Sequence, residues 1–501
     1  MSLSVFNTMG GRKEAFVPMT PGTVRMYVCG VTVYDLCHIG HARANVAFDI
    51  IVRYLRHAGY EVLYVRNFTD IDDKIIRRAN QEGIPFADVT RKYISAFYED
   101  FDRLGLLRPD AEPKATEHIP EIIDLVSRLV RAGKAYAVDG DVYYAVKGFP
   151  EYGKLSGKNV EDLLSGARVE VDERKQDPLD FALWKASKPG EPAWDSPWGP
   201  GRPGWHIECS AMSMKHLGET FDIHGGGKDL VFPHHENEIA QSEAATGKPF
   251  ARYWLHNGFV NIDNEKMSKS LGNFFTLRDV LARVKPEVLR FFLASSHYRS
   301  PIDYSDRSLV EAKAGLDRLY RVKEKAEACG AAGAAPSALP EGEEFAPLRD
   351  ARKRFDEAMD DDFNTAAALG RLFDGVRALN RLAPADPAAE RENAGRFLAG
   401  YAILEPLFGV LGVLRMSAAE YFQVDTPHVG GATVPPGAAS EGAFLPAGRL
   451  PKDDILRRIE ARQAARARKE YAEADLIRKE LEAAGVLLED GKGGTTWKYK
   501  E

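Results

Sequence analysis

The sequence predicts an α/β protein in which a parallel-sheet domain with an insertion is followed by an α-helical bundle and a small C-terminal unit. Three observations predict this. Strand-like and helix-like segments alternate near the N-terminus. This alternation is interrupted over about 110–204, and after about residue 308 apolar residues recur at helical spacing. A length of 501 residues suits three or four domains of about 100–200 residues each.

The N-terminal part begins with an apolar run over 25–29, which predicts a strand. Apolar residues then recur at helical spacing from Val46 to Leu55, and this helix is expected to stop at Gly59. A second strand is predicted over 61–65 and a second helix over 72–80. Strands that alternate with helices in this way imply a parallel sheet with crossover connections.

The segment from about 110 to 204 has a different character and is expected to be an insertion. It contains a predicted helix over 119–131 and a predicted hairpin at Asp139-Gly140, because Asp-Gly between two β-rich runs favours a tight turn. The α/β rhythm resumes with a strand at 221–223, a glycine run, a helix from Pro233 and a strand over 252–262.

The remainder is expected to be helical and then modular. We expect the first domain over 1–307, a helical bundle over 308–415, a linker over 416–451 and a C-terminal unit over 452–501. One apolar stripe with a spacing near 3.6 marks the bundle: Leu369, Leu372, Phe373, Val376, Leu379 and Leu382. Stretches rich in Ala, Gly and Pro at 330–340 and 427–451 are typical of linkers.

Composition excludes several classes of protein. Hydrophobic residues make up 44% and charged residues 28% of the chain, which is a globular mixture and excludes disorder over the whole length. No apolar run is expected to reach the roughly 18–20 residues of a membrane helix, and the N-terminus lacks a secretory apolar core. We therefore expect a cytoplasmic protein. Its four cysteines are too few for a disulfide framework and read as thiols or metal ligands.

Two short motifs suggest phosphate chemistry. His38-Ile39-Gly40-His41 lies where a strand meets a helix, and a helix N-terminus suits phosphate, while Gly40 leaves room for a flat ring such as adenine. Lys266-Met267-Ser268-Lys269-Ser270 places two lysines in a polar loop, where they would neutralise charge as pyrophosphate leaves. Taken alone, each motif is more often a surface histidine pair or a solvated loop.

Four residues far apart in the chain form an acceptable zinc set: Cys29, Cys209, His234 and Glu238. His234 and Glu238 are four residues apart on a predicted helix and so share one face. The spacing alone is weak, because there is no Cys-x-x-Cys pair. A polar helix face and two buried small hydrophobes are the alternatives.

Taken together, the two motifs resemble the HIGH and KMSKS hallmarks of the class I aminoacyl-tRNA synthetases. Four further segments look like cysteinyl-tRNA synthetases over essentially the whole chain: YVCGVTV (27–33), NFTDIDDK (67–74), GWHIECS (204–210) and HGGGKDLVFPHHENE (224–238). The resemblance implies a Rossmann-like catalytic domain over 1–307 with a KMSKS loop at 266–270. It also implies a bundle that binds tRNA and a C-terminal unit that binds the anticodon.

The resemblance also implies the ligands and their residues. One Zn²⁺ per subunit would be held by Cys29, Cys209, His234 and Glu238 and would bind the thiolate of substrate cysteine, which separates it from serine. ATP would be a substrate, with Mg²⁺ on its phosphates. The catalytic residues would be His38, His41, Lys266 and Lys269. The nucleotide would be bound by His38, Gly40, His41, Gly227, Asp229 and Lys269. The amino-acid pocket would be lined by Gly30, Thr69, Trp205 and His224. The alternatives are a helix cap for Thr69, a core aromatic for Trp205, a packed histidine for His224 and a plain turn for the glycine run 225–227.

Evidence for RNA binding is local, since the net charge is −7. Between 457 and 469, six cations accompany one carboxylate, a local charge of +5 that suits phosphate contact, although a solvated helix face is common. Trp497 or Tyr499 would stack on an anticodon base or pack in a core. The expected partners are tRNA(Cys), L-cysteine and ATP, with no membrane, and a monomer is favoured. A mycothiol-type cysteine ligase, another nucleotidyltransferase and a non-catalytic RNA-binding paralogue are the alternatives.

Overall fold

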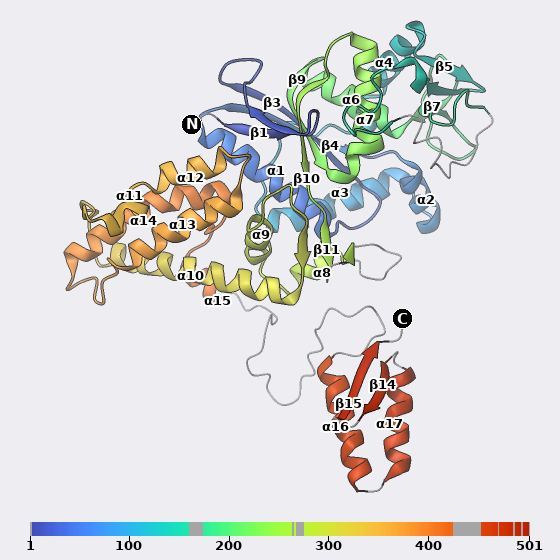
Figure 1. The fold of residues 1–501 in the computed structure, drawn as a ribbon. Helices are drawn as coiled ribbons and strands as arrows, with labels where there is room; N and C mark the ends of the chain where they lie inside the picture. The colour runs from blue at the N-terminus through green and yellow to red at the C-terminus, as the bar shows by residue number, and fades with distance from the viewer. Residues whose placement is uncertain are drawn as a thin grey trace.

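The computed structural model of the chain shows a sheet-containing body, an elongated helical bundle and a C-terminal unit (Figure 1). It describes residues 3–159, 174–262, 265–266, 275–423, 452–468, 470–483, 486–491 and 494–499.

The central sheet has four parallel strands in the order β10-β9-β3-β4, which confirms the predicted fold class. The strands are β3 (Thr23–Thr32), β4 (Glu61–Thr69), β9 (Phe221–Gly227) and β10 (Ala251–Asn257). Helix α1 (Ile39–His57) connects β3 to β4. Because β3 pairs with β9, residues almost two hundred positions apart lie side by side in the middle of the sheet.

The helix predicted over 72–80 is α2 (Asp73–Glu82), which ends at Gly83 in the left-handed conformation, and α3 (Phe86–Arg103) follows it. The strand predicted over 252–262 is interrupted: β10 ends at Asn257, and β11 (Val260–Ile262) joins another sheet with β12 (Glu265–Lys266) and β13 (Ile302–Tyr304). The interruption lies at Gly258, where the backbone passes close to that of Ser300. A Cβ on Gly258 would lie 2.4 Å from the carbonyl oxygen of Ser300, so only glycine fits there.

The insertion forms its own antiparallel sheet beside the main one. The predicted helix is α4 (Ile119–Arg131), and the predicted hairpin joins β5 (Ala135–Val138) to β6 (Asp141–Tyr144). Asp139 and Gly140 both have positive φ, 52° and 87°, as a tight two-residue turn requires. Strands β7 (Phe181–Ala186) and β8 (Gly201–Pro203) complete the sheet, which leads directly into α6 (Trp205–Leu217).

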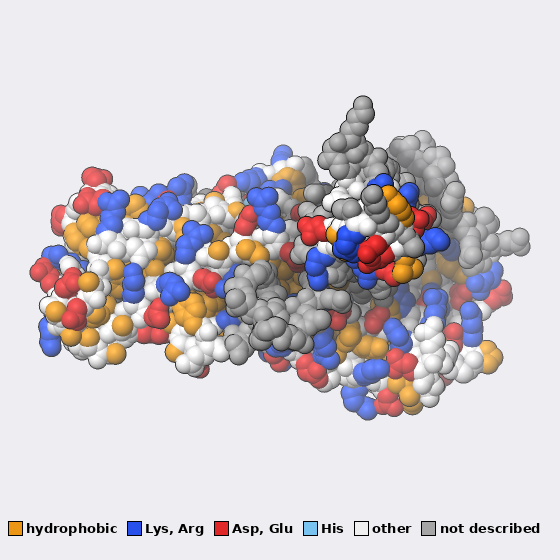
Figure 2. Space-filling view, turned by 90° about the horizontal axis from the view of Figure 1, so that it is seen from below, with side chains coloured by type: hydrophobic (Ala, Val, Ile, Leu, Met, Phe, Trp, Pro, Cys, Tyr) orange, Lys and Arg blue, Asp and Glu red, His pale blue; other side chains and the backbone are white. Residues whose placement is uncertain are grey.

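Helices dominate from Leu277 to Leu411, a range that also contains the short strand β13. They are α8 (Leu277–Leu281), α9 (Pro286–Ala294), α10 (Asp306–Ala331), α11 (Ala346–Arg349), α12 (Ala351–Met359), α13 (Thr365–Asn380) and α14 (Arg391–Leu411). The predicted apolar stripe is buried along and just after α13, with Phe373 partly buried. Figure 2 shows Lys and Arg side chains interspersed with Asp and Glu along this bundle, so the charge of the face seen there is mixed.

One helix among the described residues, α14, is long and apolar enough to cross a membrane by length and composition, although the sequence is expected to hold no such run. In the structure, 56% of its 18-residue apolar window is buried inside the protein. Phe397 and Leu404 of α14 belong to the hydrophobic core of the bundle. Its apolar composition is therefore that of a core helix.

The expected linker over 416–451 begins with a short helix, α15 (Ala418–Gln423). Tyr421 of this helix is buried and stacks on Tyr320 of α10, with ring centroids 3.7 Å apart and planes 5° apart. This stacking accounts for the helix, because it gives an otherwise short apolar segment a surface to cover. The rest of the expected linker, 424–451, lies outside the described residues.

The C-terminal unit consists of α16 (Lys452–Ala467), α17 (Tyr471–Ala483) and a hairpin of β14 (Val486–Gly491) and β15 (Gly494–Tyr499). Its own small core contains Ile455, Ile459, Leu481 and Val486. Most of the predicted basic run lies on α16, although Arg462 is buried rather than exposed. Trp497 and Tyr499 belong to β15, and their side chains lie outside the described part of the unit.

A buried arginine joins the sheet domain to the bundle. Arg290 of α9 pairs with Asp49 of α1 and donates to the carbonyl oxygens of Leu411, at the end of α14, and of Leu104, after α3. Burial raises the pKa of Asp49, but the guanidinium groups of Arg290 and Arg53 lower it more, so that it lies below its ordinary value. The carboxylate is therefore charged in the folded protein.

We expect Arg290→Met to lower the free energy of unfolding by about 3 kcal/mol, because the Asp49 carboxylate loses its buried partner and keeps only the more exposed Arg53 and one backbone N–H. Since folding depresses the pKa of Asp49, the stabilisation is present above its unfolded pKa of about 4 and is lost as the pH falls below it. Urea unfolding at pH 7 measures the loss. In the control Arg307→Met, the arginine is 89% exposed beside Glu311, and the expected loss is below about 1 kcal/mol. Equal losses would contradict the role given to Arg290.

Candidate active site

A cavity of about 520 Å³ opens at the carboxyl ends of β3 and β9, where ligands bind in sheets of this kind. Several predicted site residues line it: Cys29, Gly30, His38, Gly40, His41, Trp205, Gly227 and Asp229. Thr69 and His224 are only 2% and 0% exposed and lie behind its wall. The sheet thus gathers segments that are widely separated in the chain.

The two histidines of the first motif cap the helix that follows them. Nδ1 of His38 accepts from the backbone N–H of Gly40 at 3.1 Å, and Nδ1 of His41 accepts from the backbone N–H of His38 at 3.2 Å. Their rings stack with centroids 3.7 Å apart. In a neutral ring the remaining proton lies on Nε2, which is the donor that a phosphate oxygen requires.

The second motif begins at the end of a strand. Lys266 ends β12, whose backbone pairs with β11, and residues 267–270, with Lys269, lie outside the described residues. After this gap, the backbone N–H of Leu277 donates to the carbonyl oxygen of Cys37 at 2.6 Å. Thr276 forms an isolated antiparallel β-bridge with the backbone of His38. The chain that leaves the second motif is therefore anchored to the start of the first.

Gly30 occupies a position that only glycine fits. Its backbone N–H donates to Oδ1 of Asn67 at 2.8 Å, and a Cβ on it would lie 1.6 Å from the carbonyl oxygen of Asn67. The register of β3 against β4 shifts between Val28 and Val31. Sequence reasoning did not single out Asn67, although it lies in one of the segments that carry the resemblance.

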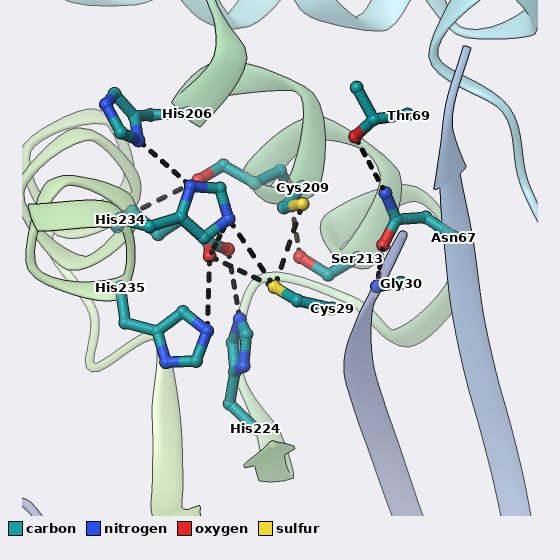
Figure 3. Close-up of polar contacts among 12 residues, drawn as sticks. Cys29, Gly30, Asn67, Thr69, His206, Cys209, Ser213, His224, His234 and His235 are labelled. Atoms are coloured by element: carbon teal, nitrogen blue, oxygen red, sulfur yellow. Dashed lines mark hydrogen bonds and ion pairs between the residues drawn. The ribbon is translucent and has the colours of Figure 1, made fainter. Parts of the chain in front are cut away.

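The proposed metal ligands meet at one point (Figure 3). Sγ of Cys29 lies 3.8 Å from Sγ of Cys209 and 3.5 Å from Nε2 of His234. Oε1 of Glu238 lies 3.5 Å from the Cys29 sulfur and 3.1 Å from Nε2 of His234. A tetrahedral zinc ion with bonds of about 2.0–2.3 Å needs ligand atoms about 3.3–3.8 Å apart. The four donors therefore suit such an ion in their chemistry, and three of the four separations lie in this range, while that between His234 and Glu238 is slightly shorter.

A second set shares two of these ligands: Cys29, His224, His235 and Glu238. Nε2 of His235 lies 4.0 Å from Oε1 of Glu238, farther than the corresponding atom of His234. This set also offers one thiol instead of two. The set with Cys209 and His234 is therefore the better match to zinc, which favours thiolates.

The helix predicted from Pro233 differs from the structure. A π-type turn, η4 (Val231–His235), precedes α7 (Glu236–Thr246), and Phe232 within it has an extended backbone with φ −141° and ψ 133°. His234 therefore lies in the turn and Glu238 in the helix. They still share one face, because Nε2 of His234 lies 3.1 Å from Oε1 of Glu238.

Two of the four donors in the cluster, Cys209 and Glu238, have lowered pKa values. The hydrogen bond from Cys29 lowers the pKa of Cys209 to about 6, against the effect of burial. Burial raises the pKa of Glu238, but His224 and His234 lower it more, to about 2. At neutral pH Cys209 is thus a thiolate and Glu238 a carboxylate. Burial lowers the pKa of His234, but Glu238 and Cys209 raise it more, to about 10, and burial raises the pKa of Cys29, so these two donors carry protons that a metal ion would displace.

Aromatic and histidine side chains orient His234. Its Nδ1 lies 2.9 Å from Nδ1 of His206, and its ring stacks on Trp205 with centroids 4.3 Å apart. Trp205, expected to line the amino-acid pocket, is 37% exposed and borders both the cavity and the metal cluster. A second ring nitrogen held in this way fixes the tautomer of a metal-binding histidine.

His224 and its neighbours form a buried histidine group behind the cluster. Nε2 of His224 lies 3.0 Å from Oε2 of Glu238, and its ring stacks on Trp254 at 4.4 Å. Nδ1 of His235 lies 2.8 Å from Nε2 of His256. Sequence reasoning left out His206, His235 and His256. The adjacent histidines of the HHENE segment were the signal for His235, but nothing local marks the others.

Gly227 and Asp229 lie at the other side of the cavity, at the end of β9 and in the turn η3 (Lys228–Leu230). A Cβ on Gly227 would lie 2.4 Å from Oδ1 of Asp229. The glycine therefore allows the carboxylate to fold back over the end of the strand. This position suits acceptance of hydrogen bonds from the hydroxyl groups of a ribose.

Known proteins match this chain over its whole length, and three family models match parts of it. Residues 15–314 match the model of the class I (C) tRNA synthetase catalytic domain, 354–415 the DALR domain and 455–497 the cysteinyl-tRNA ligase anticodon-binding domain. The chain is similar to the cysteine–tRNA ligases of Geobacter sulfurreducens (58% identity), Syntrophotalea carbinolica (56%) and Stutzerimonas stutzeri (55%), each alignment covering 100% of both chains.

Solved structures show the same fold at low sequence identity. Methionyl-tRNA synthetase of Mycobacterium tuberculosis in complex with methionyl-adenylate has a TM-score of 0.59 and 17% identity, covering 80% of this chain and 93% of that one. A putative arginyl-tRNA synthetase of Campylobacter jejuni has a TM-score of 0.56 and 13% identity, covering 79% and 94%.

Proposed function

The chain belongs to the cysteine–tRNA ligase family, and from this premise we propose that it activates L-cysteine with ATP and transfers it to the 3′ end of tRNA(Cys) with a zinc-dependent choice of amino acid. The choice of amino acid rests on one observation. Four donor atoms lie together beside the cavity, and the four distances measured among them are 3.1–3.8 Å. Zn²⁺ held by these residues would supply a soft Lewis acid that prefers the thiolate of cysteine to the hydroxyl of serine.

In the first step the carboxylate of cysteine attacks the α-phosphorus of ATP, and pyrophosphate leaves with the electron pair of the broken P–O bond. His38 and His41 donate to phosphate oxygens from Nε2, and Mg²⁺ accompanies the phosphates. Lys266 and Lys269 neutralise the charge that develops as pyrophosphate leaves. Gly227 and Asp229 hold the ribose, and Gly40 gives adenine access to the backbone. No side chain forms a covalent bond, because orientation and charge are sufficient.

In the second step a hydroxyl of the terminal ribose of tRNA attacks the carbonyl carbon of cysteinyl-adenylate, and AMP leaves. Gly30, Thr69, Trp205 and His224 are proposed to shape the amino-acid pocket, with Thr69 and His224 acting from behind its wall. The C-terminal unit is proposed to bind the anticodon, and the bundle to contact the tRNA. We also propose a cytoplasmic location, in keeping with four cysteines that form no disulfide in the structure, and a monomeric state.

The match to an anticodon-binding domain over 455–497 disfavours a mycothiol-type cysteine ligase, which would have no use for this unit. An RNA-binding paralogue without activity is disfavoured by the cavity, where His38, His41 and Asp229 are all present. No second function is therefore proposed.

The test of this function is amino-acid-dependent exchange of pyrophosphate into ATP, measured with cysteine and with serine, before and after removal of bound zinc. We expect rapid exchange with cysteine, a rate at least about 1000-fold lower with serine, since each tenfold of selectivity needs only about 1.4 kcal/mol, and recovery when zinc is returned to the stripped protein. Full activity and selectivity in the stripped protein would contradict the proposal.

A further inference from the structure

A segment of the insertion covers the turn that carries His234. This segment, residues 149–158, follows a short turn, η2 (Val146–Gly148), and we call it the strap. The hydroxyl of Tyr152 donates to Oδ1 of Asn237, and its ring meets the edge of Phe232 with centroids 6.4 Å apart. The strap therefore contacts both the turn η4 and the first residues of α7.

The central contact of the strap is made by Glu236, the first residue of α7. Its carboxylate accepts from the backbone N–H groups of Gly153 at 2.9 Å, Ser156 at 2.8 Å and Leu155 at 3.4 Å. The side chain is fully buried. Hydrogen bonds from several backbone N–H groups to one charged carboxylate are stronger than neutral ones and fix the geometry on both sides.

The strap is shaped to present these N–H groups. Gly153 has φ 99°, and a Cβ on it would lie 2.1 Å from the carbonyl oxygen of Lys158. Leu155 is buried in the same apolar cluster as Cys209, and Nζ of Lys158 lies 4.1 Å from the ring centroid of Phe232. The strap is therefore anchored on the same elements as the proposed metal ligands.

The ligand-bearing turn has no regular helix to hold it. Phe232 is extended, the π-type turn ends at His235, and α7 begins only at Glu236. The turn is held from outside by His206 and Trp205, which contact His234, and by the strap, which contacts Phe232.

We propose that Glu236 is a positioning residue, clamped by the strap, that keeps His234 and Glu238 at the spacing a tetrahedral metal ion requires. The inference rests on the proposed zinc site. Glu236 lies between the two ligands in the chain, and its three N–H partners belong to a different domain segment. The insertion thereby controls how firmly the cluster holds its ion and how well it selects cysteine.

The test is Glu236→Gln in the full-length protein loaded with Zn²⁺. The amide removes the charge and turns an NH₂ group toward N–H donors. We expect zinc release to a chelator to become about 10–100-fold faster, the range found when partners of metal ligands are removed. We also expect an altered absorption spectrum of the Co²⁺-substituted protein and a larger rise in KM for cysteine than for ATP.

Glu287→Gln is the matched control. Glu287 is likewise buried and accepts from the backbone N–H of Leu414 and the hydroxyl of Tyr320, but it lies in α9. This variant is expected to lose thermal stability with wild-type zinc release and an unchanged Co²⁺ spectrum.

Gly153→Ala breaks the same contact from the strap side and serves where Glu236→Gln yields little folded protein. We expect it to accelerate zinc release, and the double variant to release zinc no faster than the more severe single one, because both act through one contact. Wild-type release and an unchanged Co²⁺ spectrum in both single variants would overturn the inference. A wild-type protein that retains no zinc would instead contradict the zinc site itself, and the inference with it.

Discussion

Cys209→Ala is expected to abolish zinc binding and, with it, the activation of cysteine. The variant removes a buried thiol whose pKa is lowered to about 6 and whose sulfur lies 3.8 Å from that of Cys29. The remaining three donors leave the fourth tetrahedral position to water. We expect cysteine-dependent pyrophosphate exchange to fall by at least about 1000-fold, equal to about 4.1 kcal/mol.

Metal analysis of the purified variant measures the first effect, and the exchange assay measures the second. Cys329→Ala is the control, because Cys329 is also fully buried but lies in α10, outside the cluster. It should keep its zinc and its exchange rate. Unchanged zinc content in Cys209→Ala would remove Cys209 from the metal site.

Truncation after residue 423 is expected to separate the two steps of the reaction. The described part of the C-terminal unit has its own core, built from Ile455, Ile459, Leu481 and Val486, so its removal leaves the other cores intact. We expect kcat/KM for tRNA charging to fall by at least about 100-fold, equal to about 2.7 kcal/mol. The rate of cysteine-dependent exchange should stay within about twofold of the full-length value.

Charging and exchange are measured on the same preparation, so the exchange rate reports whether the shortened protein is folded. Thermal unfolding of the shortened protein provides a second control, with a midpoint near that of the full chain expected. Equal losses in charging and exchange would contradict the modular role of the C-terminal unit.

The sequence predicted those helices, strands and turns that depend on interactions between residues close together in the chain. The Asp139-Gly140 turn, the helix over 119–131 and the alternation of strands and helices depend on residues near one another in the chain, and the structure confirms them. The break at Gly258 and the short helix α15 depend instead on contacts with Ser300 and Tyr320, which no local pattern records.

For the site, the sequence by itself determined which atoms are available: two thiols, an imidazole, a carboxylate and the two motifs for phosphate. Only the tertiary structure decided that Cys29 and Cys209, 180 residues apart, face each other, and that Glu236 is held by backbone N–H groups of a strap 80–83 residues earlier. The physical reason is that side-chain chemistry belongs to single residues. Distances between donors are set by strand pairing and packing, which join segments that the linear order keeps apart.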